Sequence, residues 1–569
     1  TYASTQNQTV KELRADFGWD LGGGSRFDFG GNYRTADMHQ TFVGTQQTLG
    51  DWGITNPGDV QKIAPGALQG FCLECKFHQF NPGGDPSSQL AFRGNAADIY
   101  AILSPYYAAP HPISLTGVPA GVAPGNAVGV TSNQDNRVRE TIWAAYGQMT
   151  WNGEIAGRKA SMVAGVRYEN TKSTSTSLVA VPGAIDWVSD NDFTVVISNQ
   201  SSFLTDKGSY NNLLPSFDFR IEPAKNLIAR FSFSKSIARP NYSDLFTATT
   251  VGGPPRPTNN GGVPSGSTGN ARLSPITSDN FDVSLEYYFK PDSYISVGLF
   301  DKRVHNFIGR GQFTSDLFGL RDPSSGAAGT RSGAAKAALA ALGADTSDVN
   351  LFAMTALIQS TGSVAAASSQ FSAHFNPVAH ALDDAYVQSI NSALDVNANS
   401  TDPLYQFQVS RPINNKDAKI WGIEVAGQYF LGNTGIGVSA AYTMVRGDIG
   451  FNIGASPAED QFALLGLSDT FNATLIYDKH GLSARLAYNW RDKFLSGINR
   501  QGSRNPEFTA PFGQLDMNIS YDVTPNIAVS FEGINLTKES VRTYARAKSE
   551  LWYAQELDRR FMAGARFKF

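Results

Sequence analysis

The sequence lacks any apolar run of about 18 residues, the shortest length from which a membrane-spanning helix is usually recognised. Charged residues make up only 17% of its 569 residues, fewer than a soluble protein needs to keep its surface charged. The net charge of −4 gives no reason to expect nucleic acid as a partner. These absences exclude a helical membrane protein and argue against an ordinary soluble one.

Cysteine is almost absent, and its two copies, Cys72 and Cys75, stand close together. Scarce cysteine fits an exported protein that folds in the periplasm, where a nearby pair favours a disulfide. A zinc site that includes His78 is the alternative, although zinc normally takes four ligands and only three are local. We therefore expect a short-loop disulfide and expect no metal or cofactor.

Aromatic residues and glycine are plentiful, with 36 Phe, 21 Tyr and 55 Gly. The mean hydropathy is nevertheless only −0.23. Each strand of a membrane barrel is apolar on one face alone, so its average hydropathy stays modest. The composition therefore favours an all-β fold, a transmembrane antiparallel β-barrel in the outer membrane of a Gram-negative bacterium.

Polar and apolar residues alternate strictly over stretches of about 8 to 10 residues, which is the pattern of strands with two different faces. One set should face lipid: Phe217, Phe219, Phe231, Leu285, Leu486, Met517 and Ile519. The alternate set should line the lumen: Asp218, Arg220, Arg230, Asp282, Glu286, Glu424, Arg485 and Asp516. We expect the second set to form a solvated, mutually paired wall rather than to contact a substrate.

The connections between these strands alternate between short and long. Short turns are expected near 21–25, 153–157, 222–225, 290–293, 431–435, 478–481 and 524–526. The longest connections are expected at about 36–135, 172–206, 237–276 and 306–415. A soluble β-sandwich also alternates, but its connections are not sorted by length. The rhythm predicts short periplasmic turns and long extracellular loops.

The strand rhythm also predicts that part of a barrel is missing from this sequence. We count about 15 strands, whereas bacterial single-chain barrels have an even number. The first, near 7–20, should run inward from the cell surface, and the last, near 558–569, should end in the periplasm. The start of the chain also lacks the basic and apolar segments of a signal peptide. The chain is either a fragment or an incompletely represented protein.

The long connections contain local signals of their own. Residues 334–342 are strong helix formers, and apolar residues recur at i+4 from Leu382 to Leu394. Residues 251–270, rich in Gly, Pro, Ser and Asn, should be irregular. Several loop aromatics could stack on a ligand, but we expect them to pack within the loops: Trp52, Tyr100, Tyr106, Tyr107 and Trp187.

Five short stretches, in order along the chain, resemble TonB-dependent outer-membrane receptors. They are residues 165–171 (GVRYENT), 233–240 (FSKSIARP), 273–282 (LSPITSDNFD), 422–424 (GIE) and 533–537 (GINLT). The resemblance implies a 22-stranded barrel with a plugged lumen, of which this chain would supply roughly the eighth to the last strand. The family's N-terminal plug and its TonB-contacting box have no counterpart here.

The resemblance implies uptake of a large extracellular ligand, energised by TonB through the missing N-terminal region. The ligand could be an oligosaccharide, a ferric siderophore, haem or cobalamin. A passive porin and a surface adhesin or anchor are the alternative functions. We find no Ser/His/Asp set, zinc helix motif or phosphate loop, so we do not expect an enzyme.

The end of the chain resembles the signal read by the barrel assembly machinery. Phe561, Phe567 and Phe569 share one face of an alternating last strand and end the sequence on an aromatic residue. We therefore expect the barrel assembly machinery and outer-membrane lipid among the partners. A surface lipoprotein or another outer-membrane partner is a further expectation.

Overall fold

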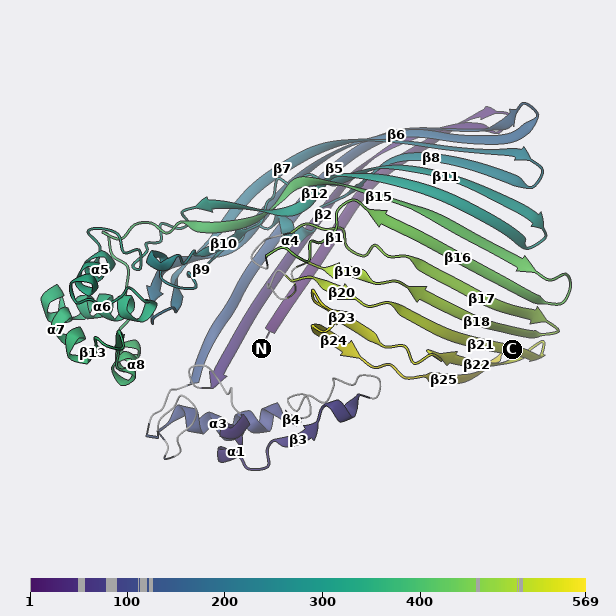
Figure 1. Cartoon of the computed structure of the whole chain (residues 1–569). Helices are drawn as coiled ribbons and strands as arrows, with labels where there is room; N and C mark the ends of the chain where they lie inside the picture. Colours follow the sequence, from purple (N-terminus) through teal and green to yellow (C-terminus); the bar gives the residue numbers. More distant parts are fainter. Residues whose placement is uncertain are drawn as a thin grey trace.

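One large curved sheet dominates the computed structural model (Figure 1). The structure describes residues 2–49, 57–77, 90–110, 112, 120–121, 126–456, 461–498, 500 and 505–569. The sheet has 17 strands, and two of them, β9 (Thr249–Gly252) and β10 (Ser265–Thr268), have only four residues. Without those two, fifteen strands remain.

The fifteen strands alternate in direction as they follow the chain. They are β1 (Tyr2–Gly22), β2 (Ser25–Leu49), β5 (Asn126–Ile155), β6 (Arg158–Trp187), β7 (Phe193–Ala224), β8 (Leu227–Ala238), β11 (Ile276–Lys290), β12 (Ser293–Ser315), β15 (Phe407–Phe430), β16 (Ile436–Gly447), β17 (Thr470–Lys479), β18 (Leu482–Arg491), β21 (Phe512–Thr524), β22 (Ile527–Ile534) and β25 (Arg560–Phe567). Each pairs antiparallel with the next one in this order.

The two edges of the sheet, β1 and β25, are not paired with each other among the described residues. The antiparallel sheet that the alternation predicts is therefore confirmed. Its closure into a barrel, and the total number of strands in that barrel, stay predictions.

Tight hairpins join the strands at one rim of the sheet, where the sequence predicts short turns (Figure 1). The first hairpin joins β1 to β2 through Gly22, Gly23 and Gly24, all with positive φ. Glycine adopts this conformation without steric cost. The structure thus gives these glycines the role of a hairpin turn.

At the other rim the strands extend further than the sequence predicts. The expected loop 172–206 is largely strand, because β6 continues to Trp187 and β7 begins at Phe193. The expected loop 36–135 likewise loses its ends to β2 and β5. The sequence analysis places the ends of these strands where the alternation of apolar and polar residues stops. Backbone pairing does not require apolar side chains, so it continues beyond that point.

The long connections also hold three small sheets and several helices. The small strands are β3 (Gln69–Cys72), β4 (Leu90–Arg93), β13 (Phe375–Asn376), β14 (Ala381–Leu382), β19 (Phe494–Gly497), β20 (Glu507–Thr509), β23 (Val541–Tyr544) and β24 (Leu551–Gln555). The helices are α1 (Pro57–Ile63), η1 (Glu74–Lys76), α3 (Ala96–Ala108), α4 (Tyr242–Leu245), η2 (Thr258–Asn260), α5 (Arg331–Ala341), α6 (Asp348–Thr361), α7 (Val364–His374) and α8 (Asp384–Ala393). Residues 251–270, expected to be irregular, contain η2 and β10 and the end of β9.

Helices α5 to α8 form a lobe with its own apolar core (Figure 1). Helices α5 and α8 confirm the two helices predicted in this loop, whereas α6 and α7 were not predicted. The tip of the β6–β7 hairpin enters the core: the ring of Trp187 stacks on Phe193 at 5.8 Å and meets Phe352 edge-on at 5.2 Å. This contact ties the lobe to the sheet.

The register of the sheet separates its side chains onto two faces. All seven residues expected to face lipid lie on one of them, the apolar face, and none of the seven is buried. Phe231, Leu285 and Leu486 are 39%, 49% and 37% exposed, respectively. Such a wide exposed apolar surface marks a site of contact with a membrane or another protein.

No helix among the described residues has the length and apolar character needed to cross a membrane.

Substitutions on neighbouring positions of β8 test the assignment of the two faces. We expect Phe231→Arg to reduce assembly strongly, because arginine on a lipid face costs about 2–4 kcal/mol near the bilayer midplane. The matched change Ser232→Arg places the same charge on the opposite face and should be tolerated. The yield of folded, heat-modifiable protein in outer-membrane fractions measures both, and equal yields would contradict the assignment.

Candidate functional site

All eight residues predicted to line the lumen lie on one face of the sheet, which we call the polar face. Asp218 lies opposite Ser232, and Ser232 lies opposite Asp282. The register of the other strand pairs places the remaining six residues on the same face. They are Arg220, Arg230, Glu286, Glu424, Arg485 and Asp516.

Several of these side chains pair with neighbours on the polar face. Arg230 Nε donates to Glu286 Oε1 at 3.0 Å, and Arg220 Nη2 donates to Glu222 Oε1 at 2.6 Å. The Ser232 hydroxyl donates to Asp218 Oδ1 at 2.7 Å. This pairing is what a solvated wall requires. Their position on the wall of a closed lumen stays a prediction.

A denser charge cluster lies near the middle of β5 and β6 on the same face. Glu169 accepts from Arg167 at 3.1 Å and also from Arg239, while its own side chain is only 7% exposed. Glu140, which is 4% exposed, accepts from the Tyr242 hydroxyl at 3.5 Å. Two buried carboxyl groups thus lie in one cluster with two arginines, and both arginines pair with Glu169.

The segment 239–273 covers this cluster, and we call it the covering segment. Its Leu245 and Leu273 pack with Met38 and Val138 of the wall. The Ser173 hydroxyl donates to the Ala271 carbonyl oxygen at 3.1 Å. A Cβ at Gly208 would lie 2.2 Å from the same oxygen, so only glycine allows the segment to come this close.

The sequence analysis did not select Glu140, Glu169 or Arg239 as site residues. Arg167, Glu169 and Arg239 lie within two of the stretches that carry the family resemblance, so their positions were noted without a role. The alternation of faces along β6 could have identified two of them together, since Arg167 and Glu169 are two residues apart and therefore share one face. The contact with Arg239 joins residues 70 apart and could not be read from local pattern.

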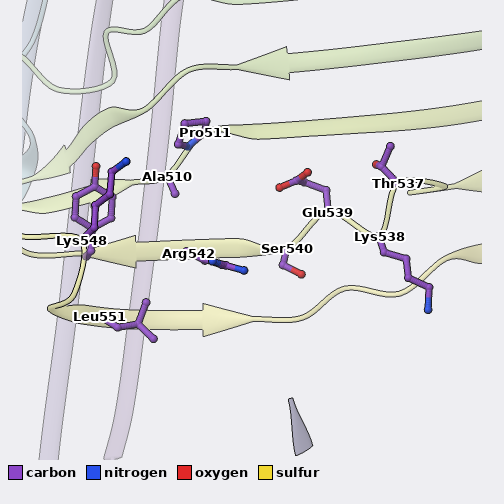
Figure 2. Close-up of a pocket in the computed structure, with 10 residues that line it drawn as sticks. Ala510, Pro511, Thr537, Lys538, Glu539, Ser540, Arg542, Lys548 and Leu551 are labelled. Carbon is purple, nitrogen blue, oxygen red and sulfur yellow. The ribbon is translucent and has the colours of Figure 1, made fainter. Parts of the chain in front are cut away.

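Two hollows on the described surface were not predicted. The larger, of about 720 Å³, lies among β23, β24 and the segment before β23, and its lining includes Lys538, Arg542 and Lys548 (Figure 2). The smaller, of about 420 Å³, lies on the polar face, with Arg14, Arg34 and Arg167 around it. Glu12 and Tyr146 complete a mixed rather than a uniformly basic lining.

A buried carboxyl supports the base of the helical lobe. Asp322 is 5% exposed and accepts from the amide of Ser324 at 2.9 Å, from its hydroxyl at 2.8 Å and from Thr258. Burial raises the pKa of Asp322 above its ordinary value, and burial beside this carboxyl also raises the pKa of Tyr405. These hydrogen bonds hold Ser324 and Thr258 together around the carboxyl.

The loop aromatics divide between packing and exposure. Trp187 is fully buried in the helical lobe, and Tyr107 is 4% exposed in a core with Val60, Ile63 and Leu103. Tyr106 packs against that core, while Tyr100 is 36% exposed. Trp52 lies outside the described residues. The packing role that we expected is confirmed for Trp187, Tyr106 and Tyr107.

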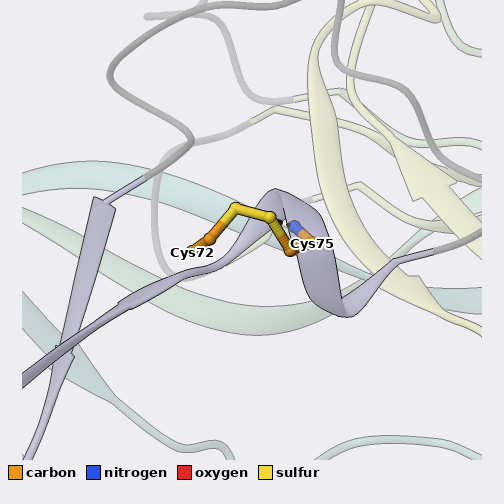
Figure 3. The surroundings of a disulfide bond; sticks show 2 residues. All are labelled: Cys72 and Cys75. Atoms are coloured by element: carbon orange, nitrogen blue, oxygen red, sulfur yellow. Dashed lines mark hydrogen bonds between the residues drawn. A yellow bond between two sulfur atoms is a disulfide. The ribbon is translucent and has the colours of Figure 1, made fainter.

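Cys72 and Cys75 form the predicted disulfide, with their sulfur atoms bonded (Figure 3). The bond joins the end of β3 to η1. Among the described residues no group of three or more His, Cys, Asp or Glu side chains is placed to hold a metal. His78, the third candidate ligand, lies outside the described residues.

The disulfide predicts that both thiols resist labelling. When intact, unreduced cells are treated with a thiol-reactive probe, Cys72 and Cys75 should remain unmodified. Prior treatment with a reducing agent should make both thiols reactive. Mass spectrometry of the peptide that contains them measures the modification. Rapid labelling before reduction contradicts the bond, and labelling that depends on added chelator indicates zinc instead.

The charge cluster predicts that Glu169 holds the covering segment in place. Removing one partner of a buried ion pair costs about 3–5 kcal/mol, and the partial exposure of both arginines makes the cost here smaller. We expect Glu169→Gln to accelerate tryptic cleavage after Arg272 in the covering segment. Glu222→Gln is the control, because it breaks a partly exposed pair with Arg220 near the hairpin rim, and pairs that water reaches are worth about 0–1 kcal/mol. Equal cleavage rates would contradict this role.

Comparison with known proteins gives a family for the chain but little detail beyond it. No curated protein matches. Solved structures with a similar arrangement include the ferric yersiniabactin uptake receptor FyuA from Yersinia pestis, at 10% identity and a TM-score of 0.47 over 100% of this chain and 55% of that one. The siderophore receptor PiuA from Acinetobacter baumannii has 10% identity and a TM-score of 0.48 over 100% and 56% of the two chains.

A third solved structure, the copper transporter OprC, has 12% identity and a TM-score of 0.47, and 58% of its chain is covered. This chain therefore spans little more than half the length of these proteins. A family model described as "TonB dependent receptor-like, beta-barrel" matches residues 1–536, nearly the whole sequence. With five characteristic stretches in order on an antiparallel sheet of fifteen long strands, the chain belongs to the TonB-dependent receptor β-barrel family.

Proposed function

We propose that the full-length protein is an outer-membrane transporter that takes up a large extracellular ligand with energy supplied through TonB. The observation that carries this proposal is the division of one family-typical sheet into an apolar face and a charged face. A sheet so divided suits a barrel that contacts lipid outside and polar material inside. The family consists of transport receptors rather than enzymes.

The outer rim supports the choice of a large ligand. Long connections at this rim carry the helical lobe, the covering segment and the disulfide-bonded segment, whereas the other rim has hairpin turns alone (Figure 1). Long loops on a rigid barrel supply a wide recognition surface. Oligosaccharides, ferric siderophores, haem and cobalamin are the candidate ligands.

The covering segment supports transport over free diffusion. It lies on the polar face near the outer end, so it narrows the route that a passive porin keeps open. Its contact with the wall includes buried polar side chains, among them Glu140, Glu169 and Ser173. We infer that the segment lies in the path of the ligand, where its displacement would accompany uptake.

The remaining partners follow from the proposed function. TonB acts through a region upstream of the described sheet, and the barrel assembly machinery reads the terminal aromatics. Phe561 and Phe567 lie on one face of β25, opposite Gly533 and Ile527. Phe569 lies two residues beyond that strand. A surface lipoprotein that docks on the outer loops is a further candidate partner.

Uptake assays in cells with and without TonB test the proposal. Cells that produce the full-length protein should accumulate one of a panel of radiolabelled ferric siderophores, haem, cobalamin and maltodextrins. Loss of TonB should abolish accumulation while surface binding remains, because binding does not require energy. The measurements are cell-associated label at saturation and the label retained after a wash.

The rival functions give different results in the same assay. Accumulation that is independent of TonB, together with steady conductance of the purified protein in planar bilayers, would indicate a passive porin. Surface binding without accumulation in either strain would indicate an adhesin or an anchor. Either result contradicts the proposed active transport.

A further inference from the structure

On the apolar face, the apolar side chains of successive strands give way to charged ones toward the outer rim. On β11, for example, Phe281, Val283 and Leu285 are followed toward the outer rim by Asp279. Charged residues of this face form a row across the sheet: Lys11, Asp37, Arg139, Lys172, Lys207, Lys235, Asp279, Asp301, Lys419 and Arg446. We call this row the outer charged row.

Three cations of the outer charged row are neutralised within it, and Arg446 pairs with Asp469 outside it. Arg139 lies 3.4 Å from Asp37, and Lys235 lies 3.5 Å from Asp279. Lys419 lies 2.9 Å from Asp301. Pairs of this kind leave little net charge for any other molecule to recognise.

Lys172 on β6 and Lys207 on β7 have no acidic partner among the described ion pairs, and the same holds for Lys11 on the edge strand β1. The side chains of Lys172 and Lys207 are exposed. Asp206 is adjacent in sequence to Lys207, but it alternates to the polar face and pairs with Arg272 at 3.0 Å. Two uncompensated positive charges therefore lie on the outside of the sheet.

The register brings these two lysines close to Arg139 and to hydroxyl groups. Arg139 lies opposite Thr174, which lies opposite Lys207. In the adjacent row, Thr141 lies opposite Lys172, which lies opposite Ser209. Since neighbouring strands are about 4.8 Å apart, three cations and three hydroxyls occupy an area about 10 Å wide.

Aromatic side chains place this area relative to the membrane. Trp143 and Tyr168 lie on the same face, nearer the hairpin rim, with ring centroids 5.3 Å apart. Such rings are enriched where acyl chains meet headgroups. Lys172 is four residues from Tyr168, or about 13 Å along a strand, which is the depth of the headgroups.

We propose that Lys172 and Lys207 bind the phosphate of an anionic lipid headgroup in the outer leaflet. The two ammonium groups donate charge-assisted hydrogen bonds to phosphate oxygens. Thr141, Thr174 and Ser209 supply hydroxyl donors between them, and the aromatic pair contacts the upper acyl chain. The site rests on the proposed lipid contact of the apolar face, which the substitution of Phe231 tests separately.

Native mass spectrometry of the detergent-purified full-length protein tests the site. The probes are phosphatidylglycerol, which carries an anionic phosphate diester, and phosphatidylcholine of the same chain length, which is zwitterionic. We expect the wild-type protein to retain phosphatidylglycerol preferentially, and Lys172→Gln with Lys207→Gln to weaken its binding about thirtyfold. That is the effect of losing two headgroup contacts of ordinary strength.

Lys225→Gln is the matched control, because it removes an exposed lysine from the β7–β8 hairpin at the opposite rim. Its binding of phosphatidylglycerol should equal that of the wild type, and heat-modifiable migration confirms that each variant is folded. Equal lipid binding by the double variant overturns the proposal. So does displacement of the lipid by millimolar inorganic phosphate, which would identify a site for free anions.

Discussion

Backbone pairing is the constraint on which the rest of this structure depends. Inside a bilayer no water can bond to a free amide or carbonyl, and each unpaired group costs several kcal/mol. Strands must therefore pair along their whole membrane-spanning length, and adjacent strands keep a fixed register. Since a shift of one residue would exchange the two faces, the pairing also decides which side chains lie on the apolar face and which lie on the polar face.

The alternation of side chains predicted this central part of the sheet well, because it has a direct physical cause. Residues such as Phe217 and Asp218 lie on opposite faces of the sheet, so local sequence records the strand, its faces and its hairpin turns. Both helices proposed in the largest loop were recognisable for a similar reason. Ala-rich residues 334–342 favour helix without help from tertiary contacts.

Prediction was weaker beyond the apolar band, where both faces of a strand meet water. The β6–β7 hairpin continues through residues such as Thr174 and Thr205, whose polarity resembles that of a loop. The contact of Arg239 with Glu169 depends on how a distant segment folds over the wall, and no local pattern encodes it. Helix α6 was missed because nearly all of its middle is buried, which hides the amphipathic period.

The connections at the two rims of the sheet differ in their structural role. One rim needs only to reverse the chain, and glycine or a short polar turn is enough for that purpose. The other rim supports separate small cores, including those around Trp187 and around Tyr107. Each core makes its loop a defined body rather than a flexible tether, so recognition can depend on shape as well as on composition.

The insertion of Trp187 into the helical lobe gives β6 two attachments. One end of the strand is anchored in the core of the lobe, and Glu169, in the middle of the same strand, contacts Arg239, the first residue of the covering segment. The two residues are 18 positions apart, or about 60 Å along an extended strand. A strand held by neighbours on both sides is stiff along its length. The helical lobe and the covering segment are therefore connected through one continuous paired strand rather than through a flexible loop.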